Sequence, residues 1–249
     1  MKNKNPLLRW VKNVLLSGAA FFVGTAFAGA ADRYVLDIPA FVMAGDPDIL
    51  FTVTPLSEGV EDAVSHTVRF VDLPAGVSVE AVGPGARPAG SPARFIVEGR
   101  QEFKLVVPPS VVERRIWLKV QNNANSRAQG ASVVNVERPV HRFSIIPLGT
   151  TAPRAGTPFH FQFMAFDEAG AVVRSFRGRV SLSALRGQVS PSELEGDVFK
   201  NGAASVHVVF SDGDLFEINR LLVTAQKSYG SPSSAEGAVD LMILPGEGQ

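Results

Sequence analysis

Apolar and polar residues alternate with a period of two along most of the chain after about residue 30. The clearest run spans residues 159–164, where three phenylalanines alternate with His, Gln and Met, and residues 116–120 repeat the pattern. A period of two is typical of a strand with one buried face. Since no segment shows a convincing helical period, the sequence predicts an all-β fold.

Clusters of turn-forming residues separate these apolar runs. Asn201-Gly202 is a tight-turn dipeptide, because both residues accept positive φ, and it predicts a hairpin. Ile38-Pro39 and Ile146-Pro147 each end a short run and predict edge strands that proline interrupts. Further strands are expected within residues 172–183 and at 198–199, and the Pro/Gly-rich stretch 83–92 reads as a loop.

The chain contains two copies of one module. Ile38-Pro39 followed by Ala44–Pro47 reappears as Ile146-Pro147 followed by Ala155–Pro158, and later apolar runs recur at a nearly constant spacing of about 105 residues. We therefore expect two domains, at residues 33–137 and 142–245. The connection between them is too short for a flexible tether, so the domains should lie end to end with restricted bending.

About seven short strands with intervening turns are expected in each module of roughly 100 residues. This pattern favours an antiparallel Greek-key sandwich of the immunoglobulin type. The fold class that follows is all-β, with two tandem immunoglobulin-like Greek-key β-sandwiches after an N-terminal signal segment.

The second module resembles the bacterial immunoglobulin-like repeats (Big, invasin and filamin-like) of exported proteins, most clearly over residues 142–244. The residues that carry the resemblance are Ala155–Phe159, Asp167–Gly170, Phe176–Ser183 and Phe199–Ala204. The first module departs from the pattern, with Glu61-Asp62 in place of the Asp-x-x-Gly turn. Because such repeats serve as spacers, adhesin stalks and carbohydrate-binding or enzyme-attached domains, the resemblance implies an extracytoplasmic accessory role.

Residues 1–30 have the features of a signal peptide. A basic start with Lys2, Lys4, Arg9 and Lys12 precedes an apolar stretch at 14–28, and small residues at 26–30 suit cleavage. The alternative is an uncleaved membrane anchor, which the short apolar run disfavours. We expect an extracytoplasmic protein, either periplasmic or secreted, that contacts a membrane only if the signal segment stays attached.

The charge balance argues against nucleic acid as a partner. The chain has 24 basic and 24 acidic residues, and four of the basic ones precede residue 31, which leaves 20 against 24, a net charge of −4. Such a chain has neither the basic footprint of nucleic-acid binding nor a polybasic membrane cluster. The absence of cysteine excludes disulfides, thiolate metal sites and a cysteine nucleophile.

The sequence offers little catalytic chemistry. Its four histidines lack metal-ligand spacing, although His160 and His207 are expected on one outer sheet face. No Gly-x-Ser-x-Gly elbow or recognisable Ser/His/Asp set is present, so we expect neither an enzyme nor a cofactor. Asp212, Asp214 and Glu217 have the residue types of a calcium loop, and are equally typical of an ordinary turn.

Trp117 and Lys119 are the candidate binding residues. Ile116, Leu118 and Val120 share the buried phase of their strand, so the two intervening side chains should face outward. An outward Trp beside Lys can stack on a sugar ring or bury in a partner surface, or instead it can shield a sheet edge or the domain junction.

The sequence therefore predicts a non-enzymatic, exported immunoglobulin-like binding or structural protein, for protein–protein interaction or adhesion at the cell envelope. Its expected partner is a protein of the envelope or extracellular space, with a glycan as the second ligand class. One alternative is a periplasmic fibre-assembly chaperone, with Arg100 and Lys104 as candidate basic anchors. Another is a carbohydrate-binding module or accessory domain pair of a hydrolase system.

Overall fold

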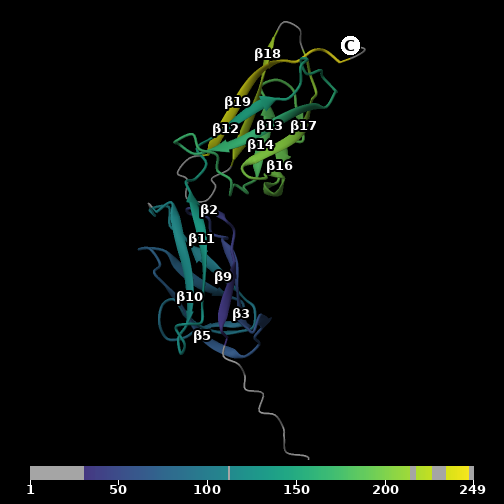
Figure 1. Cartoon of the computed structure of the whole chain (residues 1–249). Helices are drawn as coiled ribbons and strands as arrows, with labels where there is room; N and C mark the ends of the chain where they lie inside the picture. The colour runs from purple at the N-terminus through teal and green to yellow at the C-terminus, as the bar shows by residue number, and fades with distance from the viewer. Residues whose placement is uncertain (1–30, 112, 214–216, 226–233, 247–249) are drawn as a thin grey trace, which may run out of the picture.

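The computed structural model consists of two β-structured bodies that lie end to end (Figure 1). The structure describes residues 31–111, 113–213, 217–225 and 234–246. Within these residues the regular elements are strands, apart from one 3₁₀ turn, η1, at Gly196–Val198. The predicted all-β fold class is confirmed, with the strands in two sheets.

The first body contains strands β1 to β11, which belong to one sheet system. Proline explains the break in the opening run, because Pro39 separates β1 from β2. The strands are β1 Arg33–Asp37, β2 Phe41–Met43, β3 Leu50–Ser57, β4 Val60–Glu61, β5 Ser65–Val71, β6 Ser78–Val82, β7 Ala86–Pro88, β8 Arg94–Glu98, β9 Gln101–Val106, β10 Arg115–Asn122 and β11 Gln129–Glu137.

The second body contains β12 to β19. Its longest strands, such as β13, alternate buried and half-buried side chains as the sequence pattern predicts. The strands are β12 Arg142–Pro147, β13 Phe159–Phe166, β14 Val180–Ala184, β15 Val189–Ser190, β16 Glu193–Leu194, β17 Ala203–Phe210, β18 Ile218–Ala225 and β19 Ala235–Met242.

The two bodies have the same strand order. The first reads β6-β9-β3-β1-β11-β10-β5-β8-β7 and the second β15-β17-β13-β12-β19-β18-β14-β16, so each strand of the second has a counterpart in the first. Beyond the shared order, the first body adds the short strands β2, β4 and β7. The repeat seen in the sequence therefore corresponds to a repeated topology.

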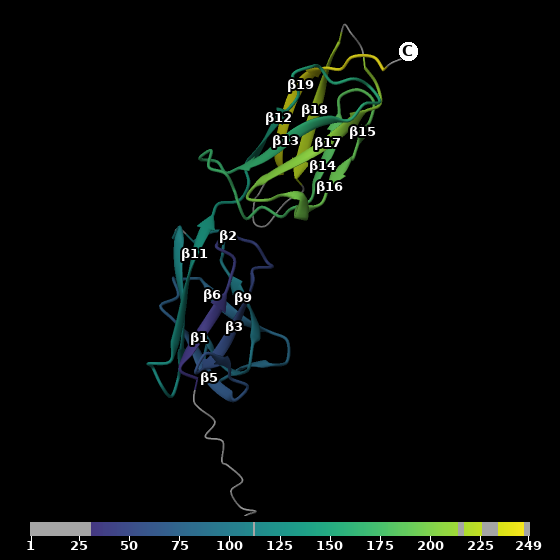
Figure 2. The same cartoon turned by 45° about the vertical axis from the view of Figure 1, so that its right-hand side comes forward.

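The opening strand of each body joins two layers of strands. β1 pairs with β3 antiparallel over its whole length and with β11 in parallel at one position, Arg33 opposite Gln129. β12 does the same with β13 and β19, with Arg142 opposite Glu236. In both bodies the opening strand therefore links the layer that contains β3 or β13 to the layer that contains β10 or β18 (Figure 2). It is not the edge strand that the sequence predicts, because it has a neighbour on each side. In the second body Pro147 lies within β12 and does not interrupt it.

A glycine follows the parallel contact in both bodies. Gly130 comes directly after Gln129, and a Cβ added to it would collide with the main-chain oxygen of Tyr34. Gly237 comes directly after Glu236, and there the collision would be with the main-chain oxygen of Phe143. The closing strand thus needs glycine to let the opening strand approach.

Phenylalanine dominates both cores. In the first body, Phe103 is fully buried, with the rings of Phe95, Phe70 and Phe51 centred 5.2, 5.3 and 5.6 Å from its own. In the second, Phe176 packs edge-on against Phe199 at 4.8 Å, with both side chains fully buried. Such aromatic burial is the main stabilising contribution available to domains without disulfides.

The first core also encloses a small polar network. His66 Nε2 lies 3.0 Å from Asp62 Oδ2, and both side chains are buried. The amide of Asn122 donates to the hydroxyl of Tyr34 at 2.9 Å, and burial raises the pKa of Tyr34. Because the ring of Tyr34 meets the imidazole of His66 edge-on, the two pairs form one cluster at the base of the core.

Three further local predictions differ from the structure. Residues 198–199 are not a strand, because η1 ends at Val198 and Phe199 reaches the core from a turn. Only Val180–Ala184 of the expected strand at 172–183 is regular, although Val173 and Phe176 are fully buried ahead of it. The stretch 83–92 contains β7 as well as loop. In the first two cases an apolar side chain fills the core from irregular backbone.

The tight turn predicted at Asn201-Gly202 is confirmed, but its first arm is an isolated bridge at Lys200 and not a strand. Both residues have positive φ, of 51° and 78°, and Lys200 and Ala203 exchange main-chain hydrogen bonds across the turn. The signal peptide expected at residues 1–30 lies outside the described residues. Within the described residues, no helix is long and apolar enough to cross a membrane.

We predict that Gly130→Ala and Gly237→Ala each destabilise the protein by about 1–3 kcal/mol, because the added methyl group must push the opening strand away. Urea denaturation measures the loss. Ala131→Ser, at an exposed site on the same strand as Gly130, is the control and should leave the midpoint unchanged. A Gly130→Ala protein as stable as the wild type would refute the close approach.

His66→Ala should lower the free energy of unfolding by about 1–3 kcal/mol, since it leaves the buried Asp62 carboxylate with fewer hydrogen-bond donors. The main-chain N–H of Val64 then remains as a donor to that carboxylate. Thermal denaturation of His66→Ala, Asp62→Asn and the double variant checks the coupling. Additive losses in the double variant would show that the two side chains do not interact.

Candidate binding surface

Trp117 and Lys119 lie on the outward side of β10 in the first body. The side chains between and beside them, Ile116, Leu118 and Val120, are fully buried, whereas Trp117 is 55% exposed. Val133 of β11 is the cross-strand neighbour of Trp117. The Lys119 ammonium contacts Asp72 Oδ2 at 2.9 Å. Whether either residue binds a ligand stays a prediction, but their outward orientation is observed.

Further cations share this side of the layer. Gln121 of β10 faces Arg69 of β5, and Arg69 lies directly opposite Arg94 of β8. Arg87 of β7 is the cross-strand neighbour of Ile96, an exposed residue of β8, and Arg115 is exposed at the start of β10. We call this surface the basic face and define it by Arg69, Arg87, Arg94, Arg115, Trp117 and Lys119.

Acidic residues do not neutralise the basic face. Asp72 pairs with Lys119, and the outward sides of these strands add Glu98 and Glu137, at opposite ends of the layer. Among the described residues, no carboxylate oxygen lies within 4.0 Å of a nitrogen of Arg69, Arg87, Arg94 or Arg115. The face is therefore locally positive on a chain whose net charge after residue 30 is −4.

The overall composition and net charge of the chain do not reveal this cluster. Its cations come from four strands between residues 69 and 119, and no two of them are neighbours in the sequence. Strand pairing brings them together, as in the register that sets Arg69 directly opposite Arg94. The sequence feature that could have identified the cluster is the position of each cation within its strand, because each occupies a polar, outward position of the alternating pattern.

The two bodies are held together by specific contacts. Oε2 of Glu137, at the end of β11, accepts hydrogen bonds from the main-chain N–H and the hydroxyl of Ser175, at 2.8 and 2.7 Å. The guanidinium of Arg174 lies 4.8 Å from the ring centroid of Phe41 in β2. In addition, Met43 and Val140 are buried in the core cluster of the second body. The junction is thus packed.

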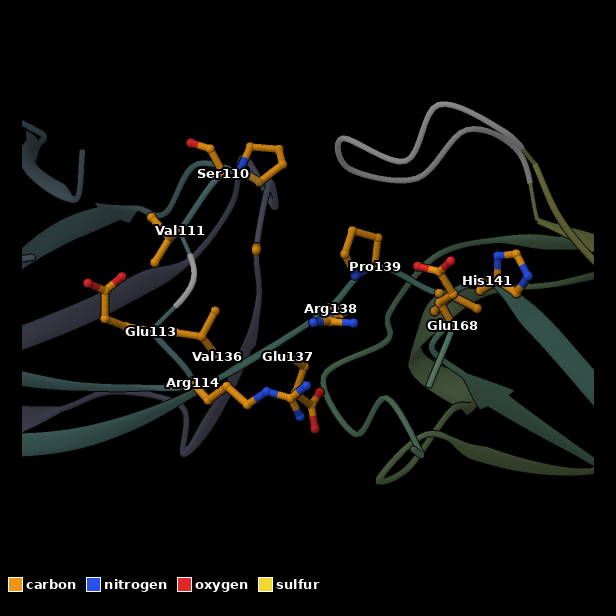
Figure 3. Close-up of a pocket in the computed structure, with 13 residues that line it drawn as sticks. Ser110, Val111, Glu113, Arg114, Val136, Glu137, Arg138, Pro139, His141 and Glu168 are labelled. Atoms are coloured by element: carbon orange, nitrogen blue, oxygen red, sulfur yellow. The ribbon is translucent and has the colours of Figure 1, made fainter. Parts of the chain in front are cut away.

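A hollow of about 520 Å³ opens beside this junction (Figure 3). Glu113 and Arg114 line it from the first body, Arg138 from the connection, and His141 and Glu168 from the second body. Acids and bases are mixed there. The candidate chaperone anchors lie elsewhere, since Arg100 pairs with Asp37 at 3.7 Å and Lys104 belongs to β9, and neither lines the hollow.

A second, more apolar hollow of about 680 Å³ lies where the first body opens between β6 and β7. Val79, Ala81, Ala86 and Phe95 contribute to its wall. The Pro/Gly-rich stretch 83–92 forms its rim, which places that stretch at an open edge between the two layers.

The acidic loop does not assemble a calcium site from the described residues. Asp214 lies outside them, and the carboxylate of Glu217 pairs with the guanidinium of Arg186. Asp212 accepts a hydrogen bond from Ser211 at 3.1 Å beside a hollow of about 210 Å³. Within the described residues, no group of three or more His, Cys, Asp or Glu side chains could hold a metal ion. A calcium loop at Asp212, Asp214 and Glu217 stays a prediction.

His160 and His207 share one outer face, as their phase predicts. They are direct cross-strand neighbours on β13 and β17, and their rings stack with centroids 4.6 Å apart and an interplanar angle of 10°. Two histidines without a third ligand make an incomplete metal site. The stack lies on the outer face of the second body.

Solved structures with some similarity include two bacterial adhesins and one enzyme. The Yersinia pseudotuberculosis adhesin InvE is 11% identical over 88% of this chain and 61% of its own, with a TM-score of 0.36. The Escherichia coli adhesin FdeC is 11% identical, with coverages of 86% and 65% and a TM-score of 0.35. The Parabacteroides merdae β-glucuronidase is 13% identical, with coverages of 84% and 24% and a TM-score of 0.30.

The chain spans less than two thirds of each of these proteins. Because every TM-score is below 0.5, these similarities carry no conclusion about function. No protein-family model matches the sequence, and no curated protein matches it either.

The junction contacts predict joint tumbling of the two bodies. Glu137→Ala, combined with Ser175→Ala, removes the hydrogen bonds across the junction and should give the bodies separate rotational correlation times in ¹⁵N relaxation, whereas the wild type shows one. Glu98→Ala, an exposed acid at the far end of the same layer, is the control. Separate tumbling already in the wild type would contradict a packed junction.

Proposed function

We propose that this chain is an exported, non-catalytic binding protein of the cell envelope, serving adhesion or protein–protein interaction, and that the basic face is its binding surface. The observation that carries the proposal is the exposed Trp117 among four arginines, Arg69, Arg87, Arg94 and Arg115, that have no carboxylate oxygen within 4.0 Å in the described structure. A large exposed aromatic side chain costs solubility, and together with arginine it is typical of the centre of binding interfaces.

The architecture supports this role. We propose two immunoglobulin-like domains, at residues 33–137 and 142–245, with the first one presenting the basic face. β10 and β11 are paired over seven positions, so Trp117 sits on a well-anchored strand pair. The packed junction would hold this surface at a fixed orientation to the second domain.

Export is the second part of the proposal. It is supported by the basic and apolar segments of residues 1–30. Expression of the full chain with a C-terminal alkaline phosphatase reporter tests export, since that enzyme is active only outside the cytoplasm. Removal of residues 1–30 should abolish reporter activity.

The binding role can be tested with fluorescently labelled protein on intact cells and isolated envelopes of the native host. Residues 31–249 should bind saturably, and Trp117→Ala should reduce the bound fraction about tenfold, since interface tryptophans often contribute 2 kcal/mol or more. Val60→Ala, which changes a residue that is 70% exposed on another strand, is the control. Circular dichroism checks that the variants are folded.

Two outcomes would contradict the proposal. Equal binding by the wild type, Trp117→Ala and Arg69→Gln would show that the basic face is not the binding surface. Turnover of a glycan or peptide substrate by the purified wild type would show that the protein is catalytic.

A further inference from the structure

We propose that the ligand of the basic face is an acidic polysaccharide, a sugar chain that carries carboxylates along its length. This inference rests on the proposed function and specifies its ligand. Three features of the basic face support it: the geometry of its cations, the cross-strand pair of Arg69 and Arg94 with like charge, and the exposed indole of Trp117.

The cations form an extended track. By strand geometry, Trp117 and Lys119 lie about 7 Å apart along β10, and Arg69 and Arg94 follow on the neighbouring strands. Arg87 continues the diagonal on β7, so the track measures roughly 25 Å from Trp117 to Arg87. Guanidinium groups bind carboxylates through paired hydrogen bonds. A linear polymer with repeated carboxylates matches such a track.

A bound anion would stabilise the cross-strand pair of Arg69 and Arg94. Like charges directly opposite each other on adjacent strands destabilise a sheet, and no carboxylate among the described residues lies within 4.0 Å of either guanidinium. Arg69 instead donates to the side-chain oxygen of Gln121 at 3.3 Å. A bound carboxylate between the two guanidinium groups would relieve their repulsion.

Trp117 argues for sugar rather than another polyanion. Its indole is 55% exposed, beside the apolar side chain of Val133, and offers a flat surface next to the Lys119 ammonium. The apolar face of a sugar ring packs on such a surface while its carboxylate reaches the ammonium in competition with Asp72. Poly-glutamate or a phospholipid headgroup presents no flat apolar ring to it.

The negative charge of the rest of the chain argues against a broad anionic surface, such as a membrane, as the ligand. A membrane would meet the acidic regions of a chain with net charge −4 as well as the basic face. A single sugar chain can follow the track and avoid them. For the same reason we do not favour duplex nucleic acid, whose high charge density requires a wide basic footprint.

The test is a binding titration of residues 31–249 with polygalacturonate and alginate. Neutral dextran, poly-glutamate, duplex DNA and phosphatidylglycerol vesicles serve as comparison ligands. The variants are Trp117→Ala and the pair Arg69→Gln with Arg94→Gln. Lys200→Gln with Arg179→Gln removes the same charge from exposed sites of the second body and is the matched control.

We expect both polyuronates to bind and dextran not to bind. The double arginine variant should lose about tenfold or more in affinity, and affinity for the wild type should fall as salt rises, because binding releases counterions. Trp117→Ala should weaken polyuronate binding about tenfold without changing the salt dependence. The matched control should bind like the wild type.

Three results would overturn the inference. Equal or tighter binding to poly-glutamate, DNA or vesicles would mean that the face recognises another polyanion. Polyuronate binding that is insensitive to Trp117→Ala would mean simple ion exchange. No polyuronate binding, with envelope binding that depends on Trp117 and disappears after protease treatment, would mean a protein ligand; the proposed function would then stand and only its ligand would change.

Discussion

The opening strand of each body is the element on which the layered structure depends. It pairs along its length with one layer and touches the other at a single parallel position, Arg33 with Gln129 and Arg142 with Glu236. The main-chain oxygens of Tyr34 and Phe143 lie so close to the closing strands that only glycine fits there. Since this contact connects the two layers around each phenylalanine core, the position of every outward face, the basic face included, follows from it.

The basic face shows that strand pairing can concentrate positive charge on one side of a chain whose net charge is negative. After residue 30 the chain is acidic overall, yet the β5, β8 and β10 registers gather arginines onto one side. Burial of Ile116, Leu118 and Val120 forces the residues between them outward, so the same alternation that builds the core also builds the surface. Trp117 stands on that surface because its neighbours in sequence are needed inside.

Local sequence pattern was sufficient for the all-β fold, for the tight turn at Asn201-Gly202 and for the outward side of Trp117, because each depends on a few adjacent residues. It failed where an apolar residue reached the core from irregular backbone, as Phe199 does after η1, since an isolated buried residue resembles part of a strand. It also missed the basic face, because the pairing of Arg69 with Arg94 depends on a register between segments about 25 residues apart, which local pattern does not encode.

The repeat in sequence and topology suggests interchangeable parts, but the junction limits how far the halves are independent. Met43 belongs to the first body by its strand and to the second by its packing, and Val140 of the connection is buried beside the second core as well. A copy of the second half cut at its first strand would lack two of the side chains that close its interior. Expressed without the first half, the second would expose part of its apolar core to water, so the repeated topology does not make the two halves separable.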